Sequence, residues 1–173
     1  GVRKGIAPLL ASGYVHASGG GVSHFLRLCG GEFASDVEIG DYLGDEGRSP
    51  DEQALAKATR HELFGGVSFA GQPFDAALRV MLTRVGFRLP GEAQKIDRMM
   101  EKFAERYCCD NPGVFPSADT AFILAYSIIM LHTDAHNPNI KPEKKMTKES
   151  FIRNNRGIAN GADLPSDFLA AIY

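Results

Sequence analysis

Helix-capping signals recur at short intervals along this chain and constrain its fold more than any other feature. Ser35-Asp36-Val37-Glu38 and Ser49-Pro50-Asp51-Glu52 both have the form of a capping box. In such a box, a Ser hydroxyl and a Glu carboxylate three residues later satisfy the free N–H groups at the start of a helix. The second box also has Pro at the first helical position, where an N–H is not needed. Ser117 and Thr147 are placed to cap two further helices.

Apolar residues after these caps repeat at the three-to-four-residue spacing of a buried helix face. The sequence predicts helices over 74–85, 96–107, 118–134, 147–157 and 164–173. Gly86 and Gly157 are placed to end two of them. The triplet Gly19-Gly20-Gly21 is interpreted as a helix break.

The chain as a whole reads as one all-α domain. No stretch alternates at period two for long, so we expect a compact superhelix or layered bundle of about ten short helices. No internal boundary divides residues 1–173, and we expect this single domain to be part of a longer protein because it starts without Met. The longest apolar run, Ala121 to Leu131, has eleven residues. A bilayer span needs about 20 residues, so this run predicts a buried helix.

Composition narrows the class of protein further. Nineteen Lys and Arg residues balance 21 Asp and Glu residues, and the net charge of -2 gives no reason to expect nucleic acid or an anionic membrane as a partner. The three cysteines, Cys29, Cys108 and Cys109, are too few for a disulfide framework and contain no C-x-x-C pair. They indicate free thiols in a reducing compartment, which suggests the cytoplasm.

The segment Phe87 to Lys95 is the first candidate for chemistry. Pro90-Gly91 predicts a tight turn between two helices, and Glu92 follows at the start of the second helix. A carboxylate at a helix N-terminus is favourable for the helix dipole alone. The alternative is that a rigid turn projects this carboxylate outward, toward the phosphate and metal site of a partner.

The segment Ala125 to Pro138 is the second candidate, because it begins as an apolar helix and becomes polar in its last turn. It could be a core helix with a polar end. It could also form a hydrophobic groove, with Ile129 and the adaptable Met130 as its floor and His136 and Asn137 as its lip.

The sequence gives little support for three enzymatic interpretations of the chain. His132, Asp134 and His136 would suit a metal-dependent hydrolase, but a third ligand with a general base beside it, as in H-E-x-x-H, is missing. The chain also contains no G-x-x-x-x-G-K-[ST] and no G-x-S-x-G, so it is not itself a P-loop GTPase or a serine hydrolase with a nucleophile elbow.

The two candidate segments together resemble the Sec7 domain, the exchange module for Arf-family GTPases. Phe87 to Arg98, FRLPGEAQKIDR, resembles the first signature motif of that family, and Leu124 to Asn137, LAYSIIMLHTDAHN, resembles the second. The match continues through Lys145 to Ile158 and Asp163 to Pro165. It is looser at Ile39 to Gly44 and Phe74 to Leu78.

The segments ADTAFILAYSIIML, TDAHNP and FIRNNRGI are most similar in sequence to the large Golgi-associated Sec7 and BIG-type subfamily. His132 departs from the pattern, because the family usually has Asn or Thr at that place, and this puts the lip of the groove in doubt. The run Asn139 to Lys145 is also slightly longer than usual, which puts the contacts of that loop in doubt.

The resemblance implies a right-handed helical superhelix with a hydrophobic groove in its C-terminal half. It implies that Glu92 is the glutamate finger, which enters the β-phosphate and Mg²⁺ site of the GTPase and promotes GDP release. The residues implied to lie near the finger or to line the groove for the GTPase switch regions are Lys95, Asp97, Asp119, Ile129, Met130, Thr133, His136 and Asn137.

Such an exchange factor breaks no covalent bond and needs no cofactor of its own, since Mg²⁺ and GDP or GTP belong to the GTPase. The resemblance implies a place on Golgi, trans-Golgi or endosomal membranes, reached through the partner or through other regions of the parent protein. It also implies brefeldin A sensitivity, which in the family follows residues matched here by Tyr126, Ser127, Asp134 and Met146. The main alternative is a module that binds an Arf-family GTPase without promoting exchange.

Overall fold

The computed structural model describes residues 1–29 and 31–173 in full, and Gly30 only as part of a helix. Within these residues the chain forms nine α-helices and one short 3₁₀ helix, with no strand beyond a single bridge between Ala159 and Ala162. The predicted all-α class and the predicted number of helices are therefore confirmed. The elements are α1 (Val2–Ala11), α2 (Gly19–Phe33), α3 (Asp36–Gly44), α4 (Pro50–Gly65), α5 (Phe74–Arg84), α6 (Ala93–Asp110), α7 (Ala118–His136), η1 (Pro142–Lys144), α8 (Lys148–Asn154) and α9 (Ser166–Ile172).

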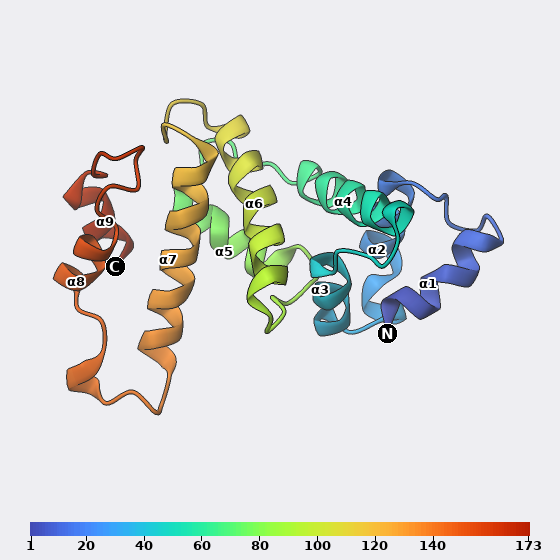
Figure 1. Cartoon of the computed structure of the whole chain (residues 1–173), viewed down its shortest axis with the longest axis horizontal. Helices are drawn as coiled ribbons and strands as arrows, with labels where there is room; N and C mark the ends of the chain where they lie inside the picture. The colour runs from blue at the N-terminus through green and yellow to red at the C-terminus, as the bar shows by residue number, and fades with distance from the viewer.

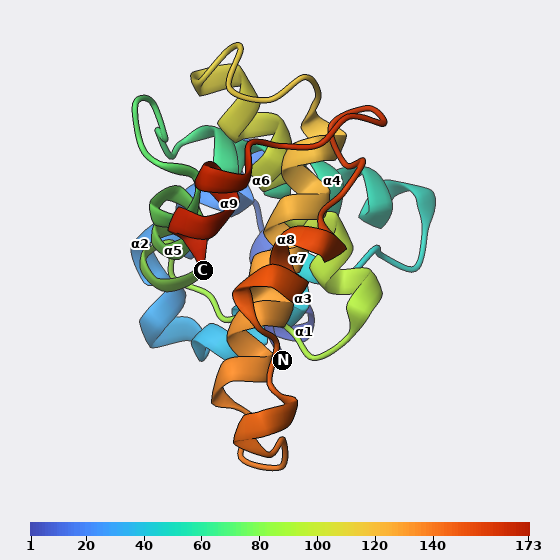
Figure 2. The same cartoon turned by 90° about the vertical axis from the view of Figure 1, so that its left-hand side faces the viewer.

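The helices are stacked along the long axis of the molecule (Figure 1). The first four helices form one end, in which α2 packs on α4 and α1 packs on α3. Helix α6 joins this end to the rest, because it packs on α3, α4, α5 and α7. At the other end α8 and α9 pack on each other and lie in front of α7 in Figure 2, with α5 to one side. Helix α7 is thus placed between α5 and the α8–α9 pair.

An aromatic cluster holds the middle of the molecule together. Phe74 of α5 lies 5.6 Å from Phe103 and 4.9 Å from Tyr107 of α6, and 4.9 Å from Phe115 in the loop before α7, between ring centroids. All four rings are buried. Burying an aromatic side chain stabilises a fold by about 1.5–3 kcal/mol, so this cluster fixes α5 and α6 against the start of α7.

The predicted caps form in the structure, with one difference. The Ser35 box is complete, because its hydroxyl accepts from the Glu38 backbone N–H and its own N–H donates to the Glu38 carboxylate. At the second box, the Ser49 hydroxyl accepts from the Glu52 N–H, but the Glu52 carboxylate accepts from the N–H of Arg48, one residue earlier. Glu52 also pairs with Arg3 at 2.6 Å, and that ion pair draws its side chain toward α1.

The Gly19-Gly20-Gly21 triplet begins α2, so the predicted helix break is wrong at these residues. The glycines are required by close contacts instead. A Cβ on Gly19 would lie 2.4 Å from the carbonyl carbon of Ala58 on α4, and a Cβ on Gly21 would lie 2.3 Å from the carbonyl oxygen of His16. The requirement for glycine at these positions comes from contacts with other parts of the chain, so the local sequence could not show it.

Helix boundaries elsewhere shift by a few residues from those predicted. Helix α6 starts three residues earlier than its apolar face, and α7 continues for two residues beyond Asp134. None of the helices in the described residues is both long and apolar enough to span a bilayer.

Candidate functional site

The turn between α5 and α6 carries Glu92. Gly86 ends α5 with a positive φ of 82°, a conformation that favours glycine. The turn is then fixed by the backbone N–H of Arg88, which donates to the carbonyl of Asp36 on α3 at 2.9 Å, and by Pro90, which is buried. Gly91 and Glu92 are exposed. The turn therefore presents a carboxylate from a rigid support.

Glu92 occupies the N-cap position of α6, with extended backbone angles. An N-cap carboxylate usually accepts from a nearby N–H, but among the described residues Glu92 makes no such side-chain bond. Its Oε1 instead lies 3.0 Å from Nζ of Lys95, and its side chain is 70% exposed. The same Nζ lies 3.1 Å from Oδ1 of Asp41 on α3. These hydrogen bonds to Glu92 and then to Asp41 raise the pKa of Lys95, so its charge is secure at neutral pH.

Tyr126 connects the middle of α7 to the start of α6. Its hydroxyl donates to the carbonyl of Ala93, the residue after Glu92, at 3.1 Å. Burial, followed by the neighbouring carboxylate of Asp97, raises the pKa of the Tyr126 hydroxyl. The structure thus brings Glu92, Lys95, Asp97 and Tyr126 together where the start of α6 meets the middle of α7, although the two sequence segments are separate.

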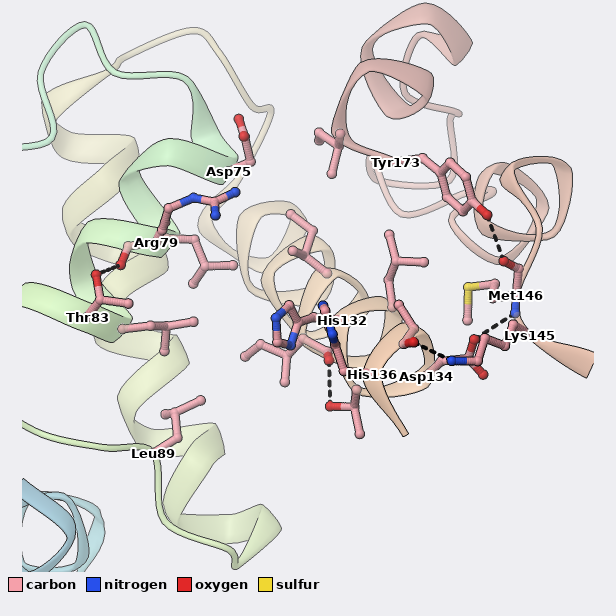
Figure 3. Close-up of a pocket in the computed structure, with 18 residues that line it drawn as sticks. Asp75, Arg79, Thr83, Leu89, His132, Asp134, His136, Lys145, Met146 and Tyr173 are labelled. Atoms are coloured by element: carbon pink, nitrogen blue, oxygen red, sulfur yellow. Dashed lines mark hydrogen bonds between the residues drawn. The ribbon is translucent and has the colours of Figure 1, made fainter. Parts of the chain in front are cut away.

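A groove crosses α7 close to this point and has a cavity volume of about 750 Å³ (Figure 3). One wall comes from α5 and from Leu89 in the turn before Glu92. The opposite wall comes from the segment after α7 and from the end of α9. The residues predicted for the site that line this groove are Ile129, Thr133, Asp134, His136 and Met146.

Met130 lies outside this groove, contrary to its predicted place in the floor. It is 61% exposed and is separated from Ile129 by one helical step of about 100°. Tyr126, Met130, Thr133 and Asn137 follow one another at spacings of four, three and four residues, so they share one stripe of α7. The predicted set therefore extends over the groove and a neighbouring, partly exposed stripe, which starts at Tyr126 beside Glu92 and shares Thr133 with the groove.

Ser127 and Asp134 lie on a third side of α7, facing the C-terminal segment. The Ser127 hydroxyl accepts from Nδ2 of Asn155 at 2.9 Å, and Oδ2 of Asp134 accepts from the backbone N–H of Met146 at 2.7 Å. The carbonyl of Met146 in turn accepts from the hydroxyl of Tyr173 at 2.9 Å. These bonds hold Met146 at the edge of the groove.

His132 and His136 point toward α5, while Asp134 lies on the side of Met146 (Figure 3). The two imidazole rings are 4.3 Å apart. Because Asp134 is bound to Met146 on another side of the helix, it does not complete a site with the two histidines. Among the described residues, no group of three His, Cys, Asp or Glu side chains could hold a metal ion.

Asp119 lies in the first turn of α7, at the opposite end of the helix from His136. With a rise of about 1.5 Å per residue, about 14 Å of helix separates it from Ile128, the first residue of α7 that lines the groove. Asp119 is therefore not a lining residue of this groove, and its predicted place near the site stays a prediction. Helices α6 and α7 are joined by a short connection and run in opposite directions, so only the start of α6 meets the later part of α7.

Comparison with known proteins agrees with this geometry. A family model described as the Sec7 domain matches residues 2–173. The chain belongs to the Sec7 domain family.

Several relatives of this Sec7 domain are large exchange proteins. It is 51% identical over 170 residues to brefeldin A-inhibited guanine nucleotide-exchange protein 2 of Arabidopsis thaliana, covering 98% of this chain and 9% of that protein. It is 46% identical over 173 residues to the human brefeldin A-inhibited guanine nucleotide-exchange protein 1, covering 99% of this chain and 9% of that protein. The chain thus spans about a tenth of the length of these relatives.

Solved structures are similar over the whole domain. The crystal structure of the Sec7p catalytic domain aligns with a TM-score of 0.81 and 41% identity, covering 99% of this chain and 87% of that one. A Sec7 domain solved with ARF1-GDP and brefeldin A aligns with a TM-score of 0.81 and 39% identity, covering 99% of this chain and 82% of that one. The fold of this Sec7 domain is therefore that of the family.

Sequence reasoning missed three residues that contribute to the site. Asp41 contacts Lys95, and Arg79 of α5 and Tyr173 line the groove. Asp41 lies within Ile39 to Gly44, a segment that resembled the family but received no role. The sequence carries no signal for Arg79 or Tyr173, because their position depends on how α5 and α9 pack beside α7.

Proposed function

We propose that this Sec7 domain promotes the release of GDP from an Arf-family GTPase. The observation that carries the proposal is the Glu92 carboxylate, which is exposed at the start of α6 beside a groove of about 750 Å³. The relatives named as nucleotide-exchange proteins, and the related Sec7 domain solved with ARF1-GDP, support the same class of partner. The groove and the exposed stripe of α7 receive the switch regions, and Glu92 enters the nucleotide site.

Electrostatics explains how one carboxylate can release a nucleotide. A small GTPase holds GDP through its phosphates, a Mg²⁺ ion and the P-loop lysine. A carboxylate brought to that place repels the β-phosphate and competes for the Mg²⁺ and the lysine. Two unit charges about 4 Å apart interact by about 4 kcal/mol at an effective dielectric constant of 20. Since each 1.4 kcal/mol is roughly tenfold in affinity, a few such interactions accelerate release by orders of magnitude. No covalent bond changes, and the domain needs no cofactor.

The experiment is GDP release from a panel of Arf-family GTPases loaded with fluorescent GDP, with excess GTP and with or without this domain. We expect release from at least one of them to rise by about tenfold or more. Glu92→Gln is the matched control, because it keeps the shape of the side chain and removes its charge. A domain that binds the GTPase but leaves release unchanged would be the binding module without exchange activity.

We further propose that residues 1–173 are the catalytic domain of a larger protein that acts at the cytoplasmic face of Golgi, trans-Golgi or endosomal membranes. The relatives support this, since the chain covers 9% of their length. Membrane association is then supplied by the GTPase partner or by other regions of the parent protein. Fluorescence microscopy of the full-length protein beside Golgi and endosomal markers tests this location.

A further inference from the structure

Helix α3 is the support on which the Glu92 segment rests. A Cβ on Gly40 would lie 1.7 Å from the carbonyl oxygen of Arg88 in the turn, and a Cβ on Gly44 would lie 2.5 Å from Cβ of Lys95. Both glycines are buried. The turn and the first turn of α6 therefore lie directly against the α3 backbone, which only glycine permits at this separation.

Two arginines fix the end of this support. The Nη1 atom of Arg60 on α4 donates to the carbonyls of Leu43 and Asp45, each at 2.9 Å. The Nη1 atom of Arg98 on α6 donates to the carbonyl of Gly44 at 2.9 Å. The last carbonyls of a helix lack partners within the helix, so these bonds satisfy them and tie α3 to both neighbouring helices.

Asp41 projects from this fixed helix toward Lys95. The Lys95 ammonium group lies between two carboxylates, at 3.1 Å from Asp41 and 3.0 Å from Glu92. The Lys95 side chain is only 17% exposed, while Asp41 is 53% exposed. The lysine stem is thus held against α3 and α6, and its charge is shared by two acids.

The net charge of Asp41, Lys95 and Glu92 affects how strongly Glu92 can repel a phosphate. The formal charges of two carboxylates and one ammonium group sum to about −1. Without Asp41, the ammonium group would pair with Glu92 alone, and the pair would be neutral. A neutral pair repels a phosphate less than a net negative one does, and a carboxylate bound more tightly to Lys95 is less free to move toward a phosphate.

We propose that Asp41 is a positioning residue for nucleotide exchange, which shares Lys95 with Glu92 and so preserves the negative charge and the freedom of the finger. This role rests on the proposed function. It gives the Ile39 to Gly44 segment a part in exchange: its glycines seat the turn and its aspartate adjusts the charge at the turn.

The first measurement is the GDP-release rate of Asp41→Asn as a function of domain concentration. We expect the maximal rate to fall by about three- to fivefold, the upper end of the effect of one exposed ion pair. The domain concentration at half-maximal rate should change by less than about twofold, because Asp41 acts through the finger and not through the groove. Asp41→Glu keeps the charge and should keep at least about half of the wild-type rate.

The second measurement separates this role from a structural one. In a Lys95→Gln background there is no ammonium group to share, so adding Asp41→Asn should change the maximal rate by less than about twofold. A purely structural role of Asp41 in α3 would give the same loss with and without Lys95. Glu46→Gln is the matched control: it removes one carboxylate near the end of α3, from a pair with Arg98 at 2.9 Å, and should leave the rate unchanged.

Each outcome is decisive. A wild-type rate for Asp41→Asn, or an equal loss in both Lys95 backgrounds, overturns the role of Asp41 while the proposed function stands. If the wild-type domain does not accelerate GDP release from any GTPase of the panel, or if Glu92→Gln is fully active, the proposed function fails and the role of Asp41 fails with it. Melting temperatures of all variants identify any loss of fold.

Discussion

Glu92 shows how the environment of a single side chain separates function from helix stability. It stands at the N-cap of α6, where a carboxylate ordinarily caps the helix, but its partner is Lys95. A carboxylate near a helix N-terminus still gains a few tenths of a kcal/mol to about 1 kcal/mol from the helix dipole. The side chain is therefore stabilised in its place without being locked to the backbone, which leaves it free to reach a partner.

Reversing the charge of Glu92 tests its role. We expect Glu92→Lys to release GDP at less than about a tenth of the wild-type rate, because a lysine attracts the phosphates that the carboxylate repels. Stability should change by less than about 1 kcal/mol, since the residue is exposed. Stopped-flow GDP release and thermal unfolding measure the two effects. The control is Glu62→Lys, which reverses an exposed carboxylate on α4 and should exchange normally. A Glu92→Lys rate above about a tenth of wild type contradicts the assignment.

Met130 tests the exposed stripe of α7. Because it is 61% exposed in the free domain, we expect Met130→Ala to leave the melting temperature nearly unchanged. The loss of a central apolar anchor should weaken GTPase binding by about 2 kcal/mol, measured by calorimetry with the nucleotide-free GTPase. Ile123→Ala is the matched control, because Ile123 is also an exposed apolar residue of α7 but lies two turns nearer its start. Equal affinity of Met130→Ala and wild type would place the contact surface elsewhere.

Asn137 lies at the end of the same stripe and caps α7. Its Oδ1 accepts from the backbone N–H of Asn139 at 2.9 Å, which leaves its amide N–H groups available for the backbone of a partner. We expect Asn137→Ala to weaken GTPase binding by about 1–3 kcal/mol, through lost hydrogen bonds. A melting curve shows how much of the effect comes from the lost turn in the free domain. Unchanged binding by both Asn137→Ala and Met130→Ala would remove the stripe from the proposed interface.

Among the elements, α3 and the turn before Glu92 depend on each other most closely. We expect Gly40→Ala to destabilise the domain by about 1–3 kcal/mol, because the new Cβ must displace the Arg88 carbonyl. For a domain of this size that corresponds to a fall in melting temperature of about 2–12 °C. Gly20→Ala on α2 is the matched control: its Cβ would meet no atom within 4 Å, so its melting temperature should stay equal or rise. A Gly40→Ala variant as stable as wild type would show that the turn is not seated on α3.

Helix α7 contributes residues to three different surfaces of the domain. Ile129 and His136 face the groove, Met130 and Asn137 belong to the exposed stripe, and Ser127 faces the C-terminal segment through its bond with Asn155. This division follows from the helix itself, since successive residues are about 100° apart. A neighbouring pair such as Ile129 and Met130 therefore lies on different surfaces of the domain.

Inhibition by brefeldin A would depend on residues from several parts of the molecule and on the bound GTPase. We expect the drug to inhibit exchange by stabilising the complex of this domain with the GDP-bound GTPase. Met146 lines the groove together with Asp134, while Tyr126 and Ser127 lie about two turns before Asp134 on the same helix. The Ser127 hydroxyl already accepts from Asn155 and Asp134 from Met146, so the polar groups are held in place before any drug binds. A ligand that needs both proteins favours their complex over either protein alone.

Inhibition should therefore deepen as the GDP-bound GTPase is raised. The measurement is the exchange rate against drug concentration at several GTPase concentrations, beside a Sec7 domain known to be sensitive. No inhibition at drug levels that stop the sensitive domain would contradict the expectation, as would inhibition that added GTPase relieves. His132 lines the same groove, so His132→Asn, which restores the usual family residue, tests whether the histidine narrows the space for the drug.

The sequence by itself determined the local features of this protein. The Ser35, Ser49, Ser117 and Thr147 caps all form, because a cap depends on residues within three positions of one another. The position of Glu92 at the start of a helix after Pro90-Gly91 was predictable for the same reason. The all-α class followed from these signals and from the absence of period-two patterns.

Tertiary structure decided everything that joins distant segments. Lys95 and Asp41 are 54 positions apart, and Tyr126 and Ala93 are 33 apart, so no local pattern could pair them. Tertiary packing also decided that Gly19 and Gly21 lie at the start of a helix. It decided that Ile129 lines the groove while Met130 does not, and that Asp119 lies at the opposite end of α7 from His136. Capping and periodicity act over one or two turns, whereas the direction in which a helix face points depends on which helix packs against it.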